Sequence, residues 1–231
     1  EVGVSDYIYH DIIIDGKSTD GTMDVVNRYR SRIAHFVSEK DNGLYDAMNK
    51  GIKLATGEII GTLNADDFYA SNDIISHVVD KMISYNAETL WGDLVYVQSG
   101  DESRIVRQWQ SSSYEPGKFQ KGWMPPHPTF FARKTIYEKL GLFNSAFIIS
   151  ADYELMLRFL EKYHVRSVYL PEVMVKMRTG GKTGKGILNL KNILRYKWED
   201  YQAWKINGLG VSFFIIFLKP LSKIGQFFKK S

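Results

Sequence analysis

The feature that most constrains the fold is an alternation between short apolar runs and segments of helical periodicity over residues 12–97. The apolar runs at 12–15, 33–38, 58–63 and 90–97 have the length of strands, whereas segments between them repeat apolar side chains at helical spacing. Strands that alternate with helices are typical of α/β domains with a parallel sheet. The sequence therefore predicts an α/β fold with a mainly parallel central sheet flanked by helices.

The helix boundaries are predicted from local signals. Thr22 is a capping residue for a helix that contains Val25 and Val26, and Gly57 is a stop signal for a helix within 41–57. Residues 74–83 and 150–163 each carry an apolar stripe at helical spacing, the second with Ser150 near its cap. Residues 99–128 are rich in Trp, Pro, Gly and Ser, and we expect a long irregular excursion there.

Carboxylates follow two of the predicted strands. Asp15 ends the first, and the pair Asp66 and Asp67 comes soon after the third. Ligands bind beyond the carboxyl ends of strands in such sheets, so these residues are expected to face one crevice. Adjacent carboxylates repel each other, and a hard divalent cation, Mg²⁺ or Mn²⁺, would relieve the repulsion. The alternative is that the pair caps the following helix.

Composition excludes several kinds of site. The chain has no Cys, which rules out disulfides, thiolate metal sites and cysteine nucleophiles. The net charge is +4, and residues 180–231 alone contain nine Lys and one Arg but only two acidic residues. The excess positive charge is therefore local, and nucleic acid is not an expected partner. No apolar run reaches the roughly 20 residues needed to span a bilayer.

Four blocks appear together and in order over about residues 10–165: "IIIDGKSTDGT", "DNGLYDAMNKGIKLATGEIIGTLNADD", "HPTFF" and "SADYELMLRF". In these blocks the chain resembles a family 2 glycosyltransferase of the GT-A fold, and most of all the bacterial members that build surface polysaccharide of the colanic-acid or O-antigen type. The resemblance implies inverting transfer from a nucleotide-sugar, usually a UDP-sugar, to an acceptor hydroxyl. The acceptor would be a glycan or a lipid-linked glycan.

The resemblance also implies roles for single residues. Asp152 matches the catalytic base, and Asp66 and Asp67 match the carboxylates that share the ribose and metal roles, with their division of labour open. Asn64 stands where many members have another Asp. The full set implied to bind the donor is Asp15, Asp46, Asn49, Asn64, Asp66, His127, Arg178 and Lys182.

Each of these residues has a structural alternative. Asp15 could order its loop, Asp46 and Asn49 could cap a helix, and Asp152 could simply favour the helix dipole. His127 lies between prolines, where a structural role is common. Arg178 precedes, and Lys182 lies within, a glycine-rich stretch that is either a mobile basic lid over the donor diphosphate or a plain linker.

The predicted domains are a GT-A domain over 1–180 and a glycine-rich loop with a basic amphipathic helical tail over 181–231. Residues 208–231 are expected to contact an anionic membrane surface, with packing on the catalytic domain or a second subunit as the alternative. The expected location is the cytoplasm, on the inner face of the bacterial cytoplasmic membrane. Family members open with a further strand and helix, so about 30 residues are expected to precede this sequence, as judged from βα-unit sizes.

Three rival functions remain open at this stage. One is sugar transfer to a polyprenyl phosphate, which would not need Asp152 as a base. Another is a non-catalytic module that binds sugar nucleotides. The third is a nucleotidyltransferase, which would share the fold and the metal carboxylates but would release pyrophosphate.

Overall fold

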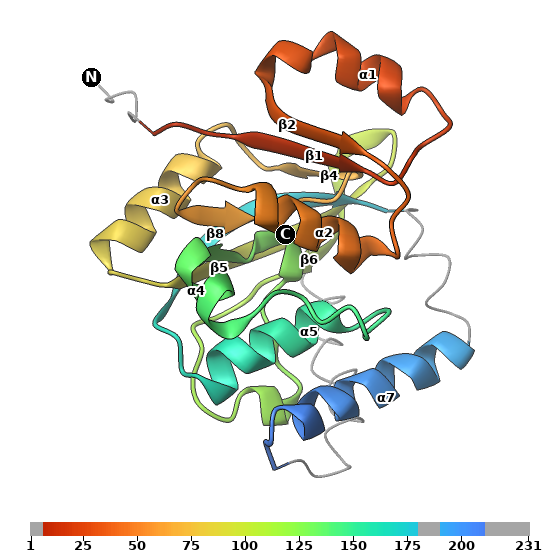
Figure 1. The fold of residues 1–231 in the computed structure, drawn as a ribbon. Helices are drawn as coiled ribbons and strands as arrows, with labels where there is room; N and C mark the ends of the chain where they lie inside the picture. The colour runs from red at the N-terminus through yellow and green to blue at the C-terminus, as the bar shows by residue number, and fades with distance from the viewer. Residues whose placement is uncertain (1–6, 180–189, 211–231) are drawn as a thin grey trace.

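The strands form two separate sheets in the computed structural model, which describes residues 7–179 and 190–210 (Figure 1). β1 (Asp11–Asp15) and β2 (Ile33–Ser38) pair in parallel as a two-stranded sheet. The second sheet has six strands in the order β3-β7-β5-β8-β4, with β6 paired to β5. Its strands are β3 (Ile59–Gly61), β4 (Asp67–Tyr69), β5 (Thr89–Gln98), β6 (Asp101–Trp109), β7 (Phe131–Arg133) and β8 (Ser167–Arg178).

The six-stranded sheet is mixed, and the prediction of a mainly parallel sheet is wrong for the described residues. Only β5 and β8 pair in parallel within it, whereas the β3–β7, β5–β7, β4–β8 and β5–β6 pairs are antiparallel. The physical reason is clearest at β6. Gly100 takes a positive φ of 85° in the short connection from β5, and such tight turns join antiparallel neighbours.

β6 also corrects the prediction of an irregular excursion over 99–128. Residues 101–109 form a strand that pairs with β5, with register shifts near Val97. The part of the segment after Trp109 is mostly loop, with short 3₁₀ turns at Phe119–Lys121 and His127–Thr129. Most of β6 is exposed, so its sequence lacks the alternation of buried and exposed residues by which a strand is recognised.

Four of the helices fall close to the predicted positions. The helices in the first half are α1 (Thr22–Arg28), α2 (Leu44–Leu54) and α3 (Ile74–Ser84), with a 3₁₀ turn at Arg30–Arg32. The later ones are α4 (Lys134–Leu140), α5 (Ala151–Met156), which continues as a π-helix over Leu157–Lys162, and α7 (Leu190–Ile206). The four are α1, α2, α3 and α5, whereas α4 was not predicted from the sequence. α3 buries Ile74, Val78 and Met82, which recur every four residues on one face.

Two predicted helix signals are wrong in detail. Thr22 is the first residue of α1 rather than its cap, and its hydroxyl donates to Asp20 Oδ1 at 2.5 Å. α2 ends at Leu54, where Ala55 turns to extended backbone, so Gly57 lies beyond the end of the helix. Ser150 does occupy the N-cap position of α5, but its side chain makes no capping hydrogen bond.

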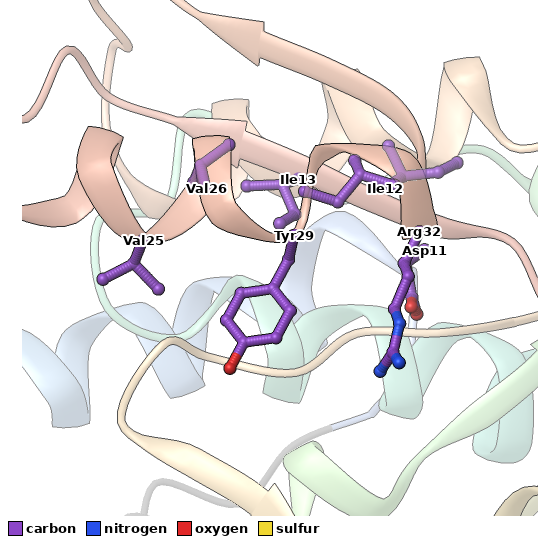
Figure 2. A pocket seen from close by; sticks show the side chains of 8 residues that line it. Asp11, Ile12, Ile13, Val25, Val26, Tyr29 and Arg32 are labelled. Carbon is purple, nitrogen blue, oxygen red and sulfur yellow. The ribbon is translucent and has the colours of Figure 1, made fainter.

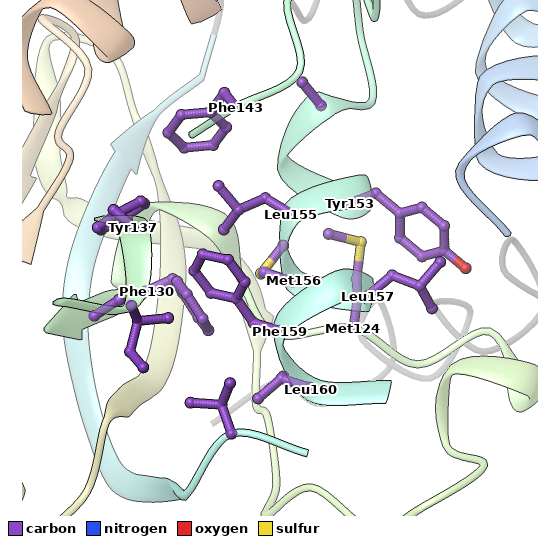
Figure 3. Close-up of a cluster of buried hydrophobic side chains, with 14 of the residues drawn as sticks. Met124, Phe130, Tyr137, Phe143, Tyr153, Leu155, Met156, Leu157, Phe159 and Leu160 are labelled. Atoms are coloured by element: carbon purple, nitrogen blue, oxygen red, sulfur yellow. The ribbon is translucent and has the colours of Figure 1, made fainter. Parts of the chain in front are cut away.

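The largest buried cluster surrounds α5 and its π-helical continuation (Figure 3). Leu155, Met156, Leu157, Phe159 and Leu160 are almost completely buried there. α7 lies beside α5 in Figure 1 and adds Ala203 and Trp204 to the same cluster. The predicted boundary at residue 180 had assigned α7 to a tail outside the domain. No described helix is long and apolar enough to cross a membrane.

Candidate active site

Asp67 is a buried carboxylate at the start of β4, a few residues after β3. Asn64 donates a hydrogen bond of 3.1 Å from Nδ2 to Asp67 Oδ2. Asn64 Oδ1 and Asp67 Oδ1 are buried without a hydrogen-bond partner. Burial disfavours the charged carboxylate and raises the pKa of Asp67 to about 6. Two hydrogen-bonded side chains thus each present an unsatisfied oxygen.

Asp66, the other half of the acidic pair, is exposed, and Arg178 at the end of β8 lies beside it. Arg178 donates from Nη1 to the backbone carbonyl of Asp66 at 3.2 Å. Its guanidinium sits 4.5 Å from the centre of the Phe68 ring, and its Nε donates to Glu102 Oε1 at 2.7 Å. The antiparallel pairing of β4 with β8 brings the predicted Arg178 to the acidic pair.

The oxygens of Asn64 and Asp67 fit a hard divalent cation. Such cations prefer oxygen ligands, and Mg²⁺ commonly takes one or two carboxylates while phosphates and water complete its shell. Within residues 7–179 and 190–210 no group of three or more His, Asp or Glu side chains could hold a metal ion. The residues present therefore fit a cation shared with a phosphate ligand, with Asp67 carrying the unsatisfied carboxylate oxygen.

Asp152 lies half-buried in the first turn of α5, within reach of Tyr45 on α2. The Tyr45 hydroxyl is 3.1 Å from Asp152 Oδ1 and 2.6 Å from the Ile149 carbonyl oxygen, and it can donate to either. Burial, with a further contribution from the Asp152 charge, raises the pKa of Tyr45, so its hydroxyl keeps its proton. Tyr45 thereby connects α2 to the carboxylate of Asp152.

Phe143 links Asn49 to the same group. Asn49 donates to the Phe143 carbonyl at 2.8 Å and accepts from the Phe143 N–H at 3.0 Å. The Phe143 ring stacks on Tyr45, with 5.6 Å between ring centres, and meets His127 edge-on at 5.9 Å. The predicted donor ligand Asn49 therefore fixes a backbone segment beside Asp152 through both of its polar atoms.

His127 lies between the residues around Asp67 and the residues around Asp152. Its Nε2 is 3.4 Å from the hydroxyl of Thr62, two residues before Asn64. Burial lowers the pKa of His127, and the negative charge of Asp152 acts in the opposite direction. The imidazole is consequently neutral near pH 7, with the Thr62 hydroxyl at its Nε2.

Asp15 and Asp46 are engaged in local structure. Asp15 accepts the Ser18 hydroxyl at 2.5 Å and the Ser38 hydroxyl at 2.6 Å, and these hydrogen bonds lower its pKa. Asp46, in the first turn of α2, accepts the N–H of Asn42, the residue before the N-cap Gly43, at 3.0 Å. These are the loop-ordering and capping contacts named above as alternatives, and donor binding by either residue stays a prediction.

Lys182 lies outside the described residues, so its predicted contact with the donor also stays a prediction. A separate open hollow of ≈ 440 Å³ lies between β1 and α1 (Figure 2). None of the predicted site residues lines this hollow, whose walls are Asp11, Ile12, Ile13, Val25, Val26, Tyr29, Arg32 and Ile33. Its lining is largely apolar, unlike the groups around Asp67 and Asp152.

Comparison with known proteins identifies the family. The model for glycosyl transferase family 2 matches residues 5–162, which include most of the residues described above. The chain belongs to glycosyltransferase family 2.

Several curated relatives of this family 2 glycosyltransferase come from mycobacteria. An uncharacterized glycosyltransferase of Mycobacterium tuberculosis is 29% identical over 149 residues, which cover 64% of this chain and 55% of the relative. A PGL/p-HBAD biosynthesis glycosyltransferase of Mycobacterium bovis is 25% identical over 187 residues, or 80% of this chain and 71% of the relative. The chain thus spans little more than half the length of the first of these relatives.

Solved structures support the fold of this family 2 glycosyltransferase. Residues 1–349 of TarS from S. aureus in complex with UDP-GlcNAc superpose with a TM-score of 0.61 at 13% identity, covering 86% of this chain and 56% of TarS 1–349. The mannosyltransferase PcManGT from Pyrobaculum calidifontis in complex with GDP-Man and Mn²⁺ gives a TM-score of 0.57 at 17% identity, covering 94% and 61%. The predicted GT-A fold is confirmed.

Sequence reasoning missed Tyr45 and Phe143 in this family 2 glycosyltransferase. Tyr45 lies four residues before Asn49, so the two side chains share one face of α2 and both reach Phe143. That spacing was visible within the block "GLYDAMNKG" and could have revealed Tyr45. Phe143 carries no comparable signal, because its contacts depend on a loop returning to α2.

Proposed function

We propose that this enzyme transfers a sugar from a UDP-sugar to an acceptor hydroxyl with inversion, in the synthesis of a bacterial cell-surface glycan. The observation that carries the proposal is the contact of Tyr45 with Asp152 in the first turn of α5. A general base has to be held in a defined orientation within hydrogen-bond reach of the proton it removes. Tyr45 gives the Asp152 carboxylate that orientation.

The proposed reaction is a single in-line displacement. The acceptor oxygen attacks the anomeric carbon while Asp152 takes the proton of the hydroxyl. The bond from the anomeric carbon to the diphosphate oxygen breaks on the opposite side, and its electron pair leaves with the nucleoside diphosphate. A positioned base of this kind typically contributes about 10²–10⁴-fold in rate.

The residues around Asp67 are proposed to bind the donor. Asn64 and Asp67 would hold Mg²⁺ or Mn²⁺ through their unsatisfied oxygens, and Asp66 is free at the surface to reach the ribose. Arg178, already beside Asp66, would contact the diphosphate. A bound cation would supply positive charge against the negative charge that develops on the leaving diphosphate. Neutral His127 would line the space between this group and Asp152.

The choice of nucleotide rests on likeness to other proteins. TarS was solved with UDP-GlcNAc, and PcManGT with GDP-Man and Mn²⁺. We propose a uridine donor. Stabilisation or turnover with a guanosine nucleotide-sugar instead would contradict this part of the proposal. The relative involved in PGL/p-HBAD biosynthesis supports an acceptor within a cell-envelope glycan or glycolipid.

A location on the inner face of the cytoplasmic membrane is part of the proposal. α7 exposes Leu194, Trp198 and Ile206, with the basic residues Arg195 and Lys205 next to them. Exposed apolar and basic side chains on one helix are features of helices that lie on anionic membranes. Residues 211–231 of the predicted contact lie outside the described residues. Co-sedimentation with vesicles that contain phosphatidylglycerol, but not with pure phosphatidylcholine, is the expected result.

A thermal-shift panel tests donor binding. The full-length protein is heated with UDP, UDP-GlcNAc, UDP-Glc, GDP-Man or ADP-Glc, each with and without Mn²⁺. At about 100 times the dissociation constant, a true donor should raise the melting temperature by about 5–10 °C. The rise should require Mn²⁺ and should be larger for uridine than for adenosine nucleotides. If no nucleotide stabilises the protein, the proposal is wrong.

A further inference from the structure

Glu199 is a buried carboxylate on α7 that serves one short segment of backbone. Its Oε1 accepts the N–H of Ile148 at 3.2 Å, and its Oε2 accepts the N–H groups of Ile149 and Ser150, each at 2.9 Å. Successive backbone N–H groups form an anion-binding concavity, and hydrogen bonds to a carboxylate are stronger than neutral ones. Residues 148–150 are therefore fixed from a helix about 50 residues further along the chain.

This segment leads directly into the helix turn that carries Asp152. Ser150 is the N-cap of α5, yet its hydroxyl is buried without a hydrogen-bond partner and makes no capping bond. The first turn of α5 thus lacks the side-chain cap that normally fixes the entry of a helix. Glu199 supplies the missing constraint from outside by holding the Ser150 N–H and the two before it.

Two further contacts join the C-terminal end of α7 and the residue after it to α5, but they lie on the other side of Asp152. Trp204 donates from Nε1 to the Tyr153 hydroxyl at 2.8 Å, and Asn207 donates from Nδ2 to Glu154 Oε1 at 3.0 Å. Glu154 is held independently by Arg158, whose Nε donates to Oε1 at 3.0 Å. Losing Asn207 would therefore leave α5 held by other contacts. Among residues 7–179 and 190–210, Glu199 is the side chain that accepts all three N–H groups of 148–150.

We propose that Glu199 is the positioning residue for Asp152. By gathering the N–H groups of 148–150, its carboxylate fixes the entry of the chain into α5 and hence the direction of the Asp152 side chain toward Tyr45 and the acceptor. Both oxygens of Glu199 are occupied by this backbone, so the residue acts through Asp152 and not on the substrate. The inference rests on the proposed function in one respect, the role of Asp152 as the base.

The test compares Glu199→Gln with Asn207→Ala in the full-length protein. Gln keeps the size of Glu but turns an amide NH₂ toward backbone N–H groups, so at least one hydrogen bond is lost. Asn207→Ala removes a buried hydrogen bond from the residue just after α7 to Glu154 of α5 without touching 148–150. Two quantities are measured: amide hydrogen exchange in a peptide spanning 145–152, and release of UDP or GDP from the fastest donor among UDP-GlcNAc, UDP-Glc and GDP-Man.

Glu199→Gln is expected to speed exchange of the 148–150 amides by about tenfold or more, since local opening governs their protection. It should lower kcat by about 10²-fold, the effect of misplacing a catalytic group by about 1 Å, and leave the KM for the donor within about twofold. Asn207→Ala should leave both kcat and the exchange of 148–150 close to the parent values. The proposal is overturned if Glu199→Gln keeps the parent kcat, or if both variants lose kcat equally.

Two additional variants ensure that the experiment can be interpreted if Glu199→Gln does not fold or if Asp152 is not the base. If Glu199→Gln gives no cooperative melt, Glu199→Asp keeps the charge on a side chain one methylene shorter and is read by the same criteria. Asp152→Asn is assayed in parallel: turnover that survives this change refutes the proposed base but leaves exchange at 148–150 as a test of the tether. Faster exchange in Glu199→Gln would then support the tether alone, and unchanged exchange would refute it.

Discussion

At the scale of single residues, Asp67 shows how much the sequence could say about the acidic pair. Two adjacent carboxylates after an apolar strand predicted a positive partner, and the structure adds that Asp67 is buried beside Asn64, while the cation itself stays a prediction. The sequence could not tell that Asp66 is exposed and Asp67 buried, because the alternation is set when β4 pairs with β8. It also could not tell which oxygens remain unsatisfied.

The raised pKa of Asp67 makes a prediction about stability and pH. The folded-state pKa of about 6 lies above the ordinary value of 3.8, so the stabilisation present below pH 4 is lost as the pH rises through about 6. Asp67→Asn keeps the shape and removes the charge. It should raise the free energy of unfolding at pH 8 by about 1–3 kcal/mol, at 1.36 kcal/mol per pKa unit, and change it little at pH 4. Urea denaturation at both pH values, with EDTA present, measures this.

The matched control for this experiment is Asp66→Asn, which changes an exposed carboxylate and should have a small effect at either pH. Asp67→Asn should also abolish any rise in melting temperature caused by Mn²⁺ together with UDP. Equal stability gains at pH 4 and pH 8 would show that charge burial is not the cause.

Tyr45 gives a second prediction at this scale. Tyr45→Phe keeps the ring stacked on Phe143 but removes the hydroxyl that meets Asp152 and the Ile149 carbonyl. Losing a hydrogen bond of about 1–1.5 kcal/mol predicts a fall in kcat of about tenfold. Tyr137→Phe is the control, because Tyr137 is buried in α4 and lies in the same cluster. The kcat for nucleotide release is measured for both variants. Equal falls in kcat would show that the Tyr45 hydroxyl has no specific role at Asp152.

At the scale of elements, prediction succeeded where an element buries a face of its own. α3 was visible because Ile74, Val78 and Met82 recur at helical spacing and all three are buried. β4 and β7 are three residues long and show no period, whereas β6 is exposed along most of its length. These strands exist because neighbouring strands offer hydrogen bonds to them, and that information is not contained in their own residues.

The space around two glycines, Gly92 in β5 and Gly51 in α2, predicts opposite effects of adding a side chain. A Cβ at Gly92 in β5 would lie 2.9 Å from the backbone oxygen of Glu172 and would overlap the Met174 side chain. Gly92→Ala should therefore lower the free energy of unfolding by about 1–3 kcal/mol. A Cβ at Gly51 in α2 would meet Ile14 at an ordinary 3.5 Å, so Gly51→Ala should stabilise by about 0.5–1 kcal/mol. Chemical denaturation of both variants measures the sign, and a neutral Gly92→Ala would contradict the packing argument.

At the scale of the whole molecule, the four sequence blocks located the family and its fold, but the sheet arrangement came only from the structure. The described residues form two sheets instead of one mainly parallel sheet. The further strand and helix expected before the sequence stay a prediction, as do the domain boundary at residue 180 and the tail. The position of α7 was unpredictable because Glu199 contacts residues about 50 positions earlier, and contacts of that range leave no local pattern.

The candidate site divides in the same way. The sequence named Asn64, Asp67, Arg178, Asn49, His127 and Asp152 as site residues. The structure brings the first three into one group and the last three into another, and it adds their partners Tyr45 and Phe143. Asp15 and Asp46 instead make the local contacts that had been weighed as alternatives. Motifs identify residue types and order, whereas hydrogen-bond partners depend on tertiary packing.

The central claim is that Asp152 acts as the base in sugar transfer from a nucleotide-sugar. The most direct measurement is steady-state release of UDP or GDP from a donor panel by the full-length protein, by Asp152→Asn, and by Asp73→Asn as an exposed control. Asp152→Asn should lower kcat by about 10²–10⁴-fold while donor-induced stabilisation is retained, and Asp73→Asn should match the parent. Full turnover by Asp152→Asn, as transfer to a phosphate acceptor would allow, or the absence of turnover with every donor, would contradict the account.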